Sequence, residues 1–160
     1  MKKYIAVKIV EAETMIIDIA IERFGRAFEG PAGSRGYLVR YSDGYESWCP
    51  EQQFDEANRP CDAMTFGLAI EAAKKGLKIA RGGWNGKNMF VVYMSPMYLP
   101  PFSDQSTNRK VNDRTAKWIG EDTPLDTLGY FAMFTADKKW LPGWLASQTD
   151  MLAEDWMIVE

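Results

Sequence analysis

Apolar and polar positions alternate over short runs in the first part of the chain, which is typical of half-buried strands. These runs predict three strands, at residues 4–10, 36–41 and 45–48. Asp43 and Gly44 separate the last two runs, and we expect a type I′ hairpin turn there because both residues tolerate a positive φ. Pro50 then favours the first turn of a short helix. Residues 1–62 are therefore predicted to form a β-hairpin-plus-helix module.

From residue 63 onward the pattern changes to helical spacing and then to further strands. Thr65 is suited to cap a helix that ends before Gly76. Strands are predicted at residues 77–81, 89–94, 130–135 and 156–159, with another that starts at residue 140. Residues 95–128 are long and irregular, apart from a short helix predicted at 112–119. For residues 63–160 we expect an α+β domain, a small antiparallel sheet packed with one or two helices.

Composition limits the chemistry that one chain can perform. None of the 160 residues is a histidine, which removes the commonest general base and metal ligand near neutral pH. A zinc site and a Ser-His-Asp or Cys-His mechanism are thereby excluded within one chain, and we expect neither a metal nor a cofactor. Cys49 and Cys61 form no C-x-x-C pair, so reduced thiols are expected.

Charge and hydropathy restrict the partners. Residues 1–62 contain eight Lys and Arg against eleven Asp and Glu, and the remaining residues contain eleven of each. Neither part has an excess of basic residues, so we expect no binding to long nucleic acids. A few backbone N–H groups and one or two cations can still hold a small phosphate. No apolar run approaches the roughly 20 residues of a membrane span, so we expect no membrane partner and a cytoplasmic location.

The Gly82-Gly83-Trp84-Asn85-Gly86 segment could contact a ligand. Its glycines would let backbone N–H groups approach a ligand, while Trp84 stacks and Asn85 hydrogen-bonds. Arg81 and Lys87 flank the segment and could neutralise phosphate. A glycine-rich hairpin turn explains the same residues without any ligand. The segment is not a Walker-type loop, because it lacks the Gly-Lys-Ser/Thr ending and leads into a strand.

The end of the chain is rich in tryptophan and short polar side chains, a mixture suited to a flat, polar molecule such as a nucleobase. Ser147-Gln148-Thr149-Asp150 matches a capping pattern, with Ser147 as the cap, which would leave the two middle side chains free. Trp144 is the candidate for stacking. Trp156 is predicted to lie in the core, and the role of Trp140 stays open.

Charged side chains elsewhere give weaker indications. A solvated loop surface explains the cations around Arg109 and Arg114, but either guanidinium would suit a phosphate if the loop covered a pocket. A carboxylate pair for hydrolysis or metal binding has no supporting spacing among the four candidates, which are Asp122, Asp126, Asp150 and Asp155.

Several segments resemble a phage family, the second type of Thoeris anti-defence protein. The resemblance covers residues 64–160, and the matching segments are 64–67 with Ala69, 81–87, 142–150 and 151–156. Several short motifs in the same order are more specific than any one of them. Residues 1–60 look like an accessory segment found ahead of other phage domains.

The resemblance implies a protein sponge for cyclic nucleotides. Members of the family bind cyclic ADP-ribose isomers made by host TIR-domain enzymes, some also bind cyclic dinucleotides, and the signal is not cleaved. They form homotetramers with pockets between protomers. We therefore expect a non-enzyme that acts in the cytoplasm of an infected bacterial host. The expected ligand-binding residues are Trp84, Asn85, Gly86, Arg109, Arg114, Trp144, Ser147, Gln148, Thr149 and Asp150.

Two other functions remain as alternatives. One is a phosphodiesterase or glycohydrolase that degrades the same signal. The other is an inhibitor that binds the host immune enzyme directly, protein against protein. Recovery of intact ligand would separate sequestration from hydrolysis, and titration with purified nucleotides would separate a nucleotide partner from a protein partner.

Overall fold

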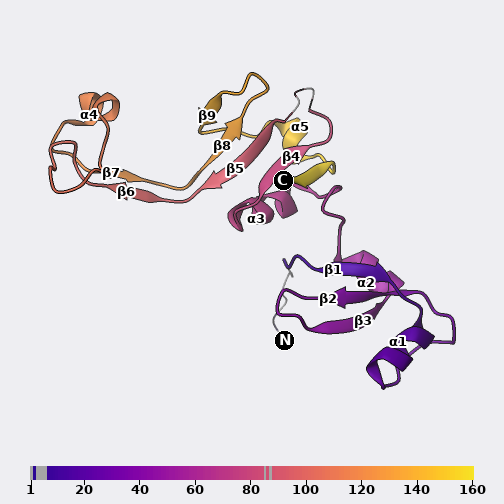
Figure 1. Cartoon of the computed structure of the whole chain (residues 1–160). Coiled ribbons are helices and arrows are strands. Elements are labelled where there is room, and N and C mark those ends of the chain that lie inside the picture. Colours follow the sequence, from indigo (N-terminus) through magenta and orange to yellow (C-terminus); the bar gives the residue numbers. More distant parts are fainter. Residues whose placement is uncertain (1, 3–6, 85, 87) are drawn as a thin grey trace. The chain divides into compact units, whose positions relative to one another are not determined.

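A computed structural model describes residue 2, residues 7–84, residue 86 and residues 88–160 (Figure 1). The chain forms two compact units, Met1–Pro60 and Cys61–Glu160, called unit 1 and unit 2 below. Each contains helices and antiparallel strands, so the predicted α+β class is confirmed. No helix among the described residues is long and apolar enough to cross a bilayer.

Unit 1 is built on a three-stranded antiparallel sheet in the order β1-β2-β3. Its elements are β1 (Glu11–Thr14), α1 (Ile17–Phe24), β2 (Gly36–Arg40), β3 (Glu46–Pro50) and α2 (Glu51–Ala57). The core forms where Ile17 and Ala20 of α1 meet the buried Trp48 of β3. The Trp48 indole N–H also donates to the Met15 carbonyl at 2.9 Å, so the one polar atom of this ring is satisfied.

The predicted hairpin of β2 and β3 is confirmed, but its turn is not type I′. Gly44 has a φ of +82°, whereas Asp43 keeps a negative φ. The Gly44 N–H donates to the Tyr41 carbonyl, and the Tyr41 N–H donates to Tyr45, both at 2.9 Å. This is a type I turn followed by a left-handed glycine, which needs only one residue of positive φ.

The strand predicted at residues 4–10 is wrong in its described part, because residues 7–10 are not in a strand and β1 begins at Glu11. The reason lies in the partner strand. Glu11 pairs with Arg40, the last residue of β2, and the hairpin turn follows immediately. Alternation therefore indicated a strand where β2 offers no residue to pair with.

Unit 2 contains a five-stranded antiparallel sheet in the order β10-β4-β5-β8-β9. Its strands are β4 (Lys78–Arg81), β5 (Phe90–Met94), β8 (Tyr130–Phe134), β9 (Trp140–Pro142) and β10 (Trp156–Val159). One helix, α3 (Phe66–Lys74), packs against β4, β5 and β10. As predicted, the Thr65 hydroxyl caps α3 by accepting from the Leu68 N–H at 3.5 Å.

The core of unit 2 forms where small side chains of α3 meet large ones of the sheet. Ala69 and Ala73 are buried on the inner face of the helix, and they belong to the same cluster as Ile79, Val91 and Trp156. Small helical residues let the helix approach the sheet closely, so that the indole of Trp156 is fully covered. The ring of Trp156 also contacts Trp84 and Trp144, which are described in the next subsection.

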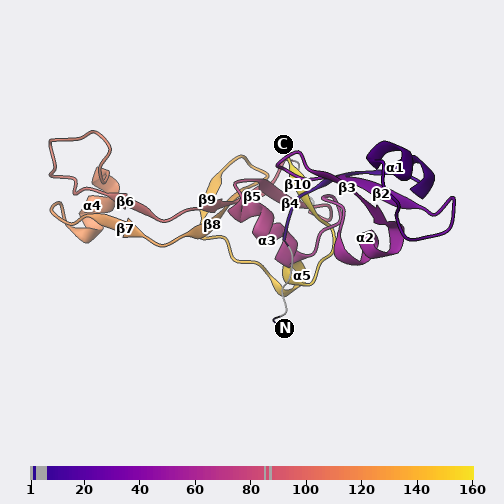
Figure 2. The same ribbon diagram turned by 90° about the horizontal axis from the view of Figure 1, so that it is seen from below.

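Residues 95–128 were predicted to be irregular apart from one helix, and this is wrong. β6 (Met97–Leu99) pairs with β7 (Leu125–Thr127), and the predicted helix appears as α4 (Asp113–Ile119). Figures 1 and 2 show β6 and β7 leading away from the five-stranded sheet to α4, an arrangement called the extension below. Each strand has three residues, and residues 100–124 separate them, so no local pattern indicates the pairing.

Replacing Ile79 with Ala should destabilise unit 2 by about 2 to 5 kcal/mol, because it leaves a cavity in a closed core. The matched control is Leu128→Ala, whose side chain is 87% exposed and should cost little. Urea unfolding followed by tryptophan fluorescence measures both, since five of the six tryptophans lie in unit 2. Equal unfolding midpoints for the two variants would contradict this description of the core.

Candidate ligand-binding site

Three tryptophans meet in one cluster of unit 2. Trp84, Trp144 and Trp156 contact one another edge to face, with ring centroids 5.5 to 6.2 Å apart and interplanar angles of 72° to 76°. Trp156 is completely buried, which confirms its predicted place in the core. Trp84 and Trp144 are half-buried and pack against the same core. Trp140, in β9, is 44% exposed.

The sheet brings these rings together from distant parts of the sequence. Trp156 opens β10 and lies opposite Arg81, the last residue of β4, so the turn with Trp84 starts beside it. The Trp144 N–H donates to the Phe131 carbonyl of β8 at 2.8 Å, which fixes the third segment to the same sheet. Edge-to-face packing suits the quadrupole of aromatic rings and adds to the stability that burial supplies.

A short helix, α5 (Gln148–Met151), stands beside the cluster and has the predicted capping box. The Ser147 hydroxyl accepts from the Asp150 N–H at 3.1 Å, and the Asp150 carboxylate accepts from the Ser147 N–H at 3.0 Å. Gln148 and Thr149 are exposed. Within the described part of the chain, no hydrogen bond involves either side chain, and their contact with a ligand stays a prediction.

Arg81 ties the end of β4 to both of the other segments. Its Nε donates to Asp155 at 2.8 Å, and its Nη1 donates to Asp150 at 3.0 Å and to the Thr149 carbonyl at 3.3 Å. The Arg81 and Asp150 side chains are each only 14% exposed. The position of Arg81 in the sequence suggested that it could neutralise a phosphate. Because carboxylates of the protein already bind its guanidinium, it is not available for that role. Lys87 lies outside the described residues.

Asp150 holds its neighbours with both of its oxygens. Oδ1 accepts from Arg81 and, at 3.3 Å, from the Trp84 indole N–H. Oδ2 accepts from the Ser147 N–H and, at 2.7 Å, from the Ser147 hydroxyl. A carboxylate offers about four acceptor positions, so those of Asp150 are filled by the protein itself. Its arrangement suits a residue that orients Trp84 and α5.

Electrostatics keep both carboxylates ionised. Burial raises the pKa of Asp150, but hydrogen bonds from Ser147, Arg81 and Trp84 together outweigh burial and hold this pKa below its usual range. The hydrogen bond from Arg81 is the largest influence on Asp155 and lowers its pKa, with a further contribution from the Gly83 N–H. Both groups therefore act as acceptors near neutral pH, and neither is suited to donate a proton.

Two further residues of the Gly82–Gly86 segment, Gly86 and Asn85, were predicted to contact a ligand. Gly86 is half-buried, and a Cβ there would overlap Met89 and meet Ala136 at 2.7 Å, so packing alone requires glycine. Asn85, a predicted ligand contact, lies outside the described residues. Its role stays a prediction.

The two candidate arginines lie in the extension. Arg114 is in α4, and Arg109 is in the loop that precedes it. Both views show α4 at the end of the extension remote from α5 (Figures 1 and 2). One chain thus brings together Trp84, Trp144 and Ser147–Asp150, but it does not bring these arginines to them. Their contact with phosphate stays a prediction.

Sequence reasoning missed the organising role of Arg81 and Asp155. Arg81 was considered as a phosphate ligand, and Asp155 as one member of a carboxylate pair. The available signal was positional: Arg81 ends one predicted strand, and Asp155 immediately precedes another. If these strands pair in antiparallel order, as β4 and β10 do, the two side chains meet at the same end of the sheet.

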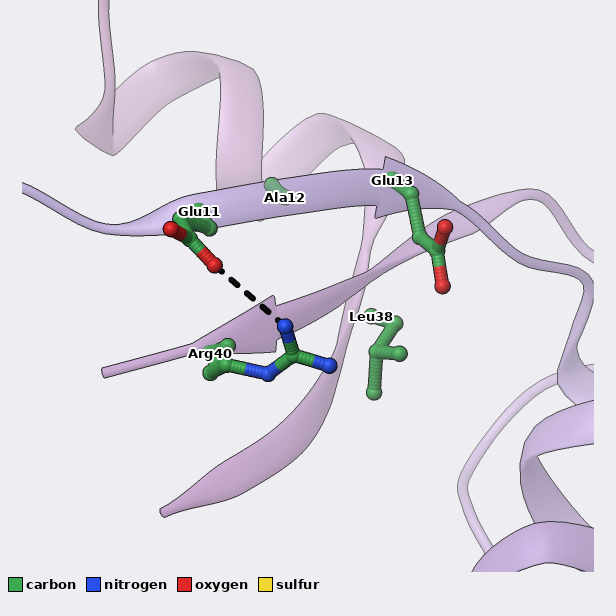
Figure 3. A pocket seen from close by; sticks show the side chains of 5 residues that line it. All are labelled: Glu11, Ala12, Glu13, Leu38 and Arg40. Atoms are coloured by element: carbon green, nitrogen blue, oxygen red, sulfur yellow. Dashed lines mark hydrogen bonds and ion pairs between the residues drawn. The ribbon is translucent and has the colours of Figure 1, made fainter. Parts of the chain in front are cut away.

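Two open depressions lie in unit 1, and neither contains a predicted site residue. Figure 3 shows the first, of about 390 Å³, lined by Glu11, Ala12, Glu13, Leu38 and Arg40. An ion pair of 3.3 Å joins Glu11 to Arg40 there. The second, of about 650 Å³, lies beside Met15, Ile16 and Ile19. An exposed ion pair of this kind contributes little to stability. We assign neither depression a function.

Acid should weaken unit 2 through Asp150 and Asp155. Their pKa values are lower in the folded chain, so below about pH 4 the unfolded chain binds more protons and unfolding becomes easier. This contribution to stability is complete above that pH and is lost as the pH falls through the folded pKa values. Asp155→Asn should make the loss shallower.

Urea unfolding at about pH 3 and about pH 6 measures this difference in stability. The matched control is Asp137→Asn, which removes a carboxylate from an exposed ion pair with Lys139 and should change the pH dependence less. The same fall in the wild-type chain and in Asp155→Asn would contradict the expectation.

Comparison with known proteins covers most of unit 2. Residues 64–159 match the family described as the Thoeris anti-defense 2-like domain. The chain is also 38% identical to Thoeris anti-defense 2 of Bacillus phage SP01 over 96 residues, which are 60% of this chain and 94% of the relative. The tryptophan cluster, Arg81 and the α5 cap all lie in the matched region. The chain therefore belongs to the Thoeris anti-defense 2-like family and is a viral anti-defence protein directed against Thoeris.

Proposed function

We propose that unit 2 binds and sequesters a cyclic adenine nucleotide, a cyclic ADP-ribose isomer made by a host TIR-domain enzyme, without cleaving it. Cyclic dinucleotides are a second ligand class of the same chemistry. The observation that carries this proposal is the pair of half-buried indoles, Trp84 and Trp144, beside the free side chains of Gln148 and Thr149. Flat aromatic faces with adjacent hydrogen-bonding groups suit a purine.

The angle between the rings limits how a base can bind. Trp84 and Trp144 meet at 74° with centroids 6.2 Å apart, so one base cannot lie parallel to both rings. Each ring can offer its own face to a base. Stacking on one aromatic ring contributes about 1 to 3 kcal/mol. Gln148 and Thr149 then provide the donors and acceptors that read the edge of a base or a ribose.

Phosphate groups need a cation from elsewhere. Arg81 lies between two carboxylates, so this trio carries no positive charge toward a ligand. Nanomolar sequestration requires about −12 kcal/mol, which stacking alone does not supply. We assign the phosphate contacts to Arg109 or Arg114 of the extension. In a homotetramer with pockets between protomers, the extension of one protomer would complete the site of another.

The state of the carboxylates favours sequestration over hydrolysis. Glycoside hydrolysis needs a carboxylic acid whose raised pKa keeps it protonated near neutral pH, together with a second, ionised carboxylate. Asp150 and Asp155 both have lowered pKa values, and both are bound to Arg81. This arrangement supports a binding site that leaves the glycosidic bond intact.

The bound nucleotide should be recovered unchanged. Cyclic ADP-ribose isomers are incubated with excess protein, the protein is denatured, and the supernatant is analysed by liquid chromatography and mass spectrometry. Intact nucleotide, after binding has been shown by calorimetry, is the expected result. Hydrolysis products would overturn sequestration. Absence of binding for every isomer and for cyclic dinucleotides would favour a protein partner instead.

Trp84→Ala and Trp144→Ala should each weaken nucleotide binding by about 1 to 3 kcal/mol, the contribution of one stacked ring. The matched control is Trp140→Ala, which removes a tryptophan of the same sheet outside the cluster. Titration calorimetry gives the affinities, and size-exclusion chromatography reports whether the assembly is intact. If both cluster variants bind like the control, the proposed site is wrong.

A further inference from the structure

We propose that Arg81 and Asp155 are positioning residues that hold Trp84 in the orientation in which it stacks on a ligand. Neither residue is assigned a ligand contact, so their effect on binding is indirect. The inference rests on the proposed function for its effect on affinity. The orientation of Trp84 itself, however, can be measured in the ligand-free chain.

Two hydrogen bonds restrain Trp84 from opposite ends. The Gly83 N–H, in the residue immediately before Trp84, donates to Asp155 Oδ2 at 2.7 Å and fixes the backbone. The Trp84 indole N–H donates to Asp150 at 3.3 Å and fixes the ring. The acceptors belong to different segments, the residue before β10 and helix α5. The ring therefore keeps its orientation only if those two segments keep their relative positions.

Arg81 fixes those relative positions. Its planar guanidinium donates to Asp155 through Nε and to Asp150 through Nη1, so one rigid group sets the separation of both carboxylates. The Trp156 indole donates to the Asp150 carbonyl at 2.9 Å and anchors α5 to the core. Without Arg81, two ionised carboxylates would lie close together unneutralised and repel each other.

The glycine at position 83 is explained by the same network. A Cβ on Gly83 would lie 2.9 Å from Asp155 Oδ2 and 3.5 Å from Arg81 Nη2. A side chain there would therefore push the Asp155 carboxylate away from the turn. Close approach to a carboxylate of the protein accounts for this glycine without a ligand.

One consequence concerns what Trp84 can recognise. Its indole N–H is the only polar atom of the ring, and Asp150 accepts it. Trp84 therefore presents an aromatic face and no free donor, and any purine ring can stack on it. Discrimination between nucleotides falls to other groups of the site, such as Gln148 and Thr149.

Asp155→Asn tests the proposal in the full chain. Asparagine keeps the shape of the side chain, but one of its two polar atoms is an NH₂ group, which donates. In either orientation of the amide, this NH₂ group would face another donor, the Gly83 N–H or the Arg81 guanidinium. Affinity for the cyclic ADP-ribose isomer that the wild-type chain binds most tightly should fall about tenfold, the effect of leaving Trp84 in its stacking orientation in about one molecule in ten. The matched control is Asp137→Asn, which changes the same side chain at an exposed ion pair and should leave affinity unaltered.

An NMR measurement separates positioning from a general loss of stability. The indole ¹H–¹⁵N signals of the ligand-free protein are recorded at a temperature where circular dichroism shows both variants folded, and Trp84→Phe assigns the Trp84 signal. In Asp155→Asn the Trp84 signal should shift or broaden, whereas the Trp140 signal should stay in place. Arg81→Lys keeps the charge but loses the planar guanidinium, and it should also shift or broaden the Trp84 signal. This variant replaces Asp155→Asn if Asp155→Asn does not fold.

Each outcome decides the matter. Lower affinity together with a displaced Trp84 signal supports the proposal. An unmoved Trp84 signal overturns it. An affinity within about twofold of the wild-type value overturns it as well, because Trp84 would then keep its stacking orientation in at least about half of the molecules. If the wild-type chain binds none of the nucleotides, the proposed function fails, while the Trp84 signal of the ligand-free variants still decides whether Arg81 and Asp155 position the ring.

Discussion

The guanidinium of Arg81, held between Asp150 and Asp155, is the interaction on which the rest of the candidate site depends. It joins the end of β4 to helix α5 and to the residue before β10, which are both distant from β4 in sequence. Two of the three ionised side chains are largely covered, so solvent screens their attraction less than it screens an exposed pair. Through these carboxylates, the interaction restrains the backbone before Trp84 and the indole N–H of the ring.

The same interaction shapes the chemistry of the site. Arg81 lies three residues before Trp84, yet two carboxylates of the protein neutralise its charge. The carboxylates, in turn, are stabilised in their ionised form and are poor proton donors. A surface of aromatic faces and neutral polar groups results. Such a surface suits the binding of a base. The proposed function therefore assigns the phosphates to cations outside this surface.

Local signals predicted much of unit 2. The Thr65 cap and the Ser147 and Asp150 capping box involve atoms within three residues of one another, so the amino-acid order nearly dictates them. The strands of the five-stranded sheet followed from apolar runs with clear turn residues between them. The β6 and β7 pair could not be predicted, because three-residue strands separated by residues 100–124 have no local preference for each other.

By itself, the sequence determined that tryptophans, short polar side chains and glycine-rich turns concentrate in the region that the family match covers. Only the tertiary structure decided which of these residues bind other groups of the protein and which stay exposed. Asp150 and Asp155 are 69 and 74 positions from Arg81, and no periodic pattern connects them. The antiparallel pairing of β4 with β10 brings these charges together. For this reason Arg81, which the sequence suggested as a phosphate ligand, instead binds carboxylates of the protein.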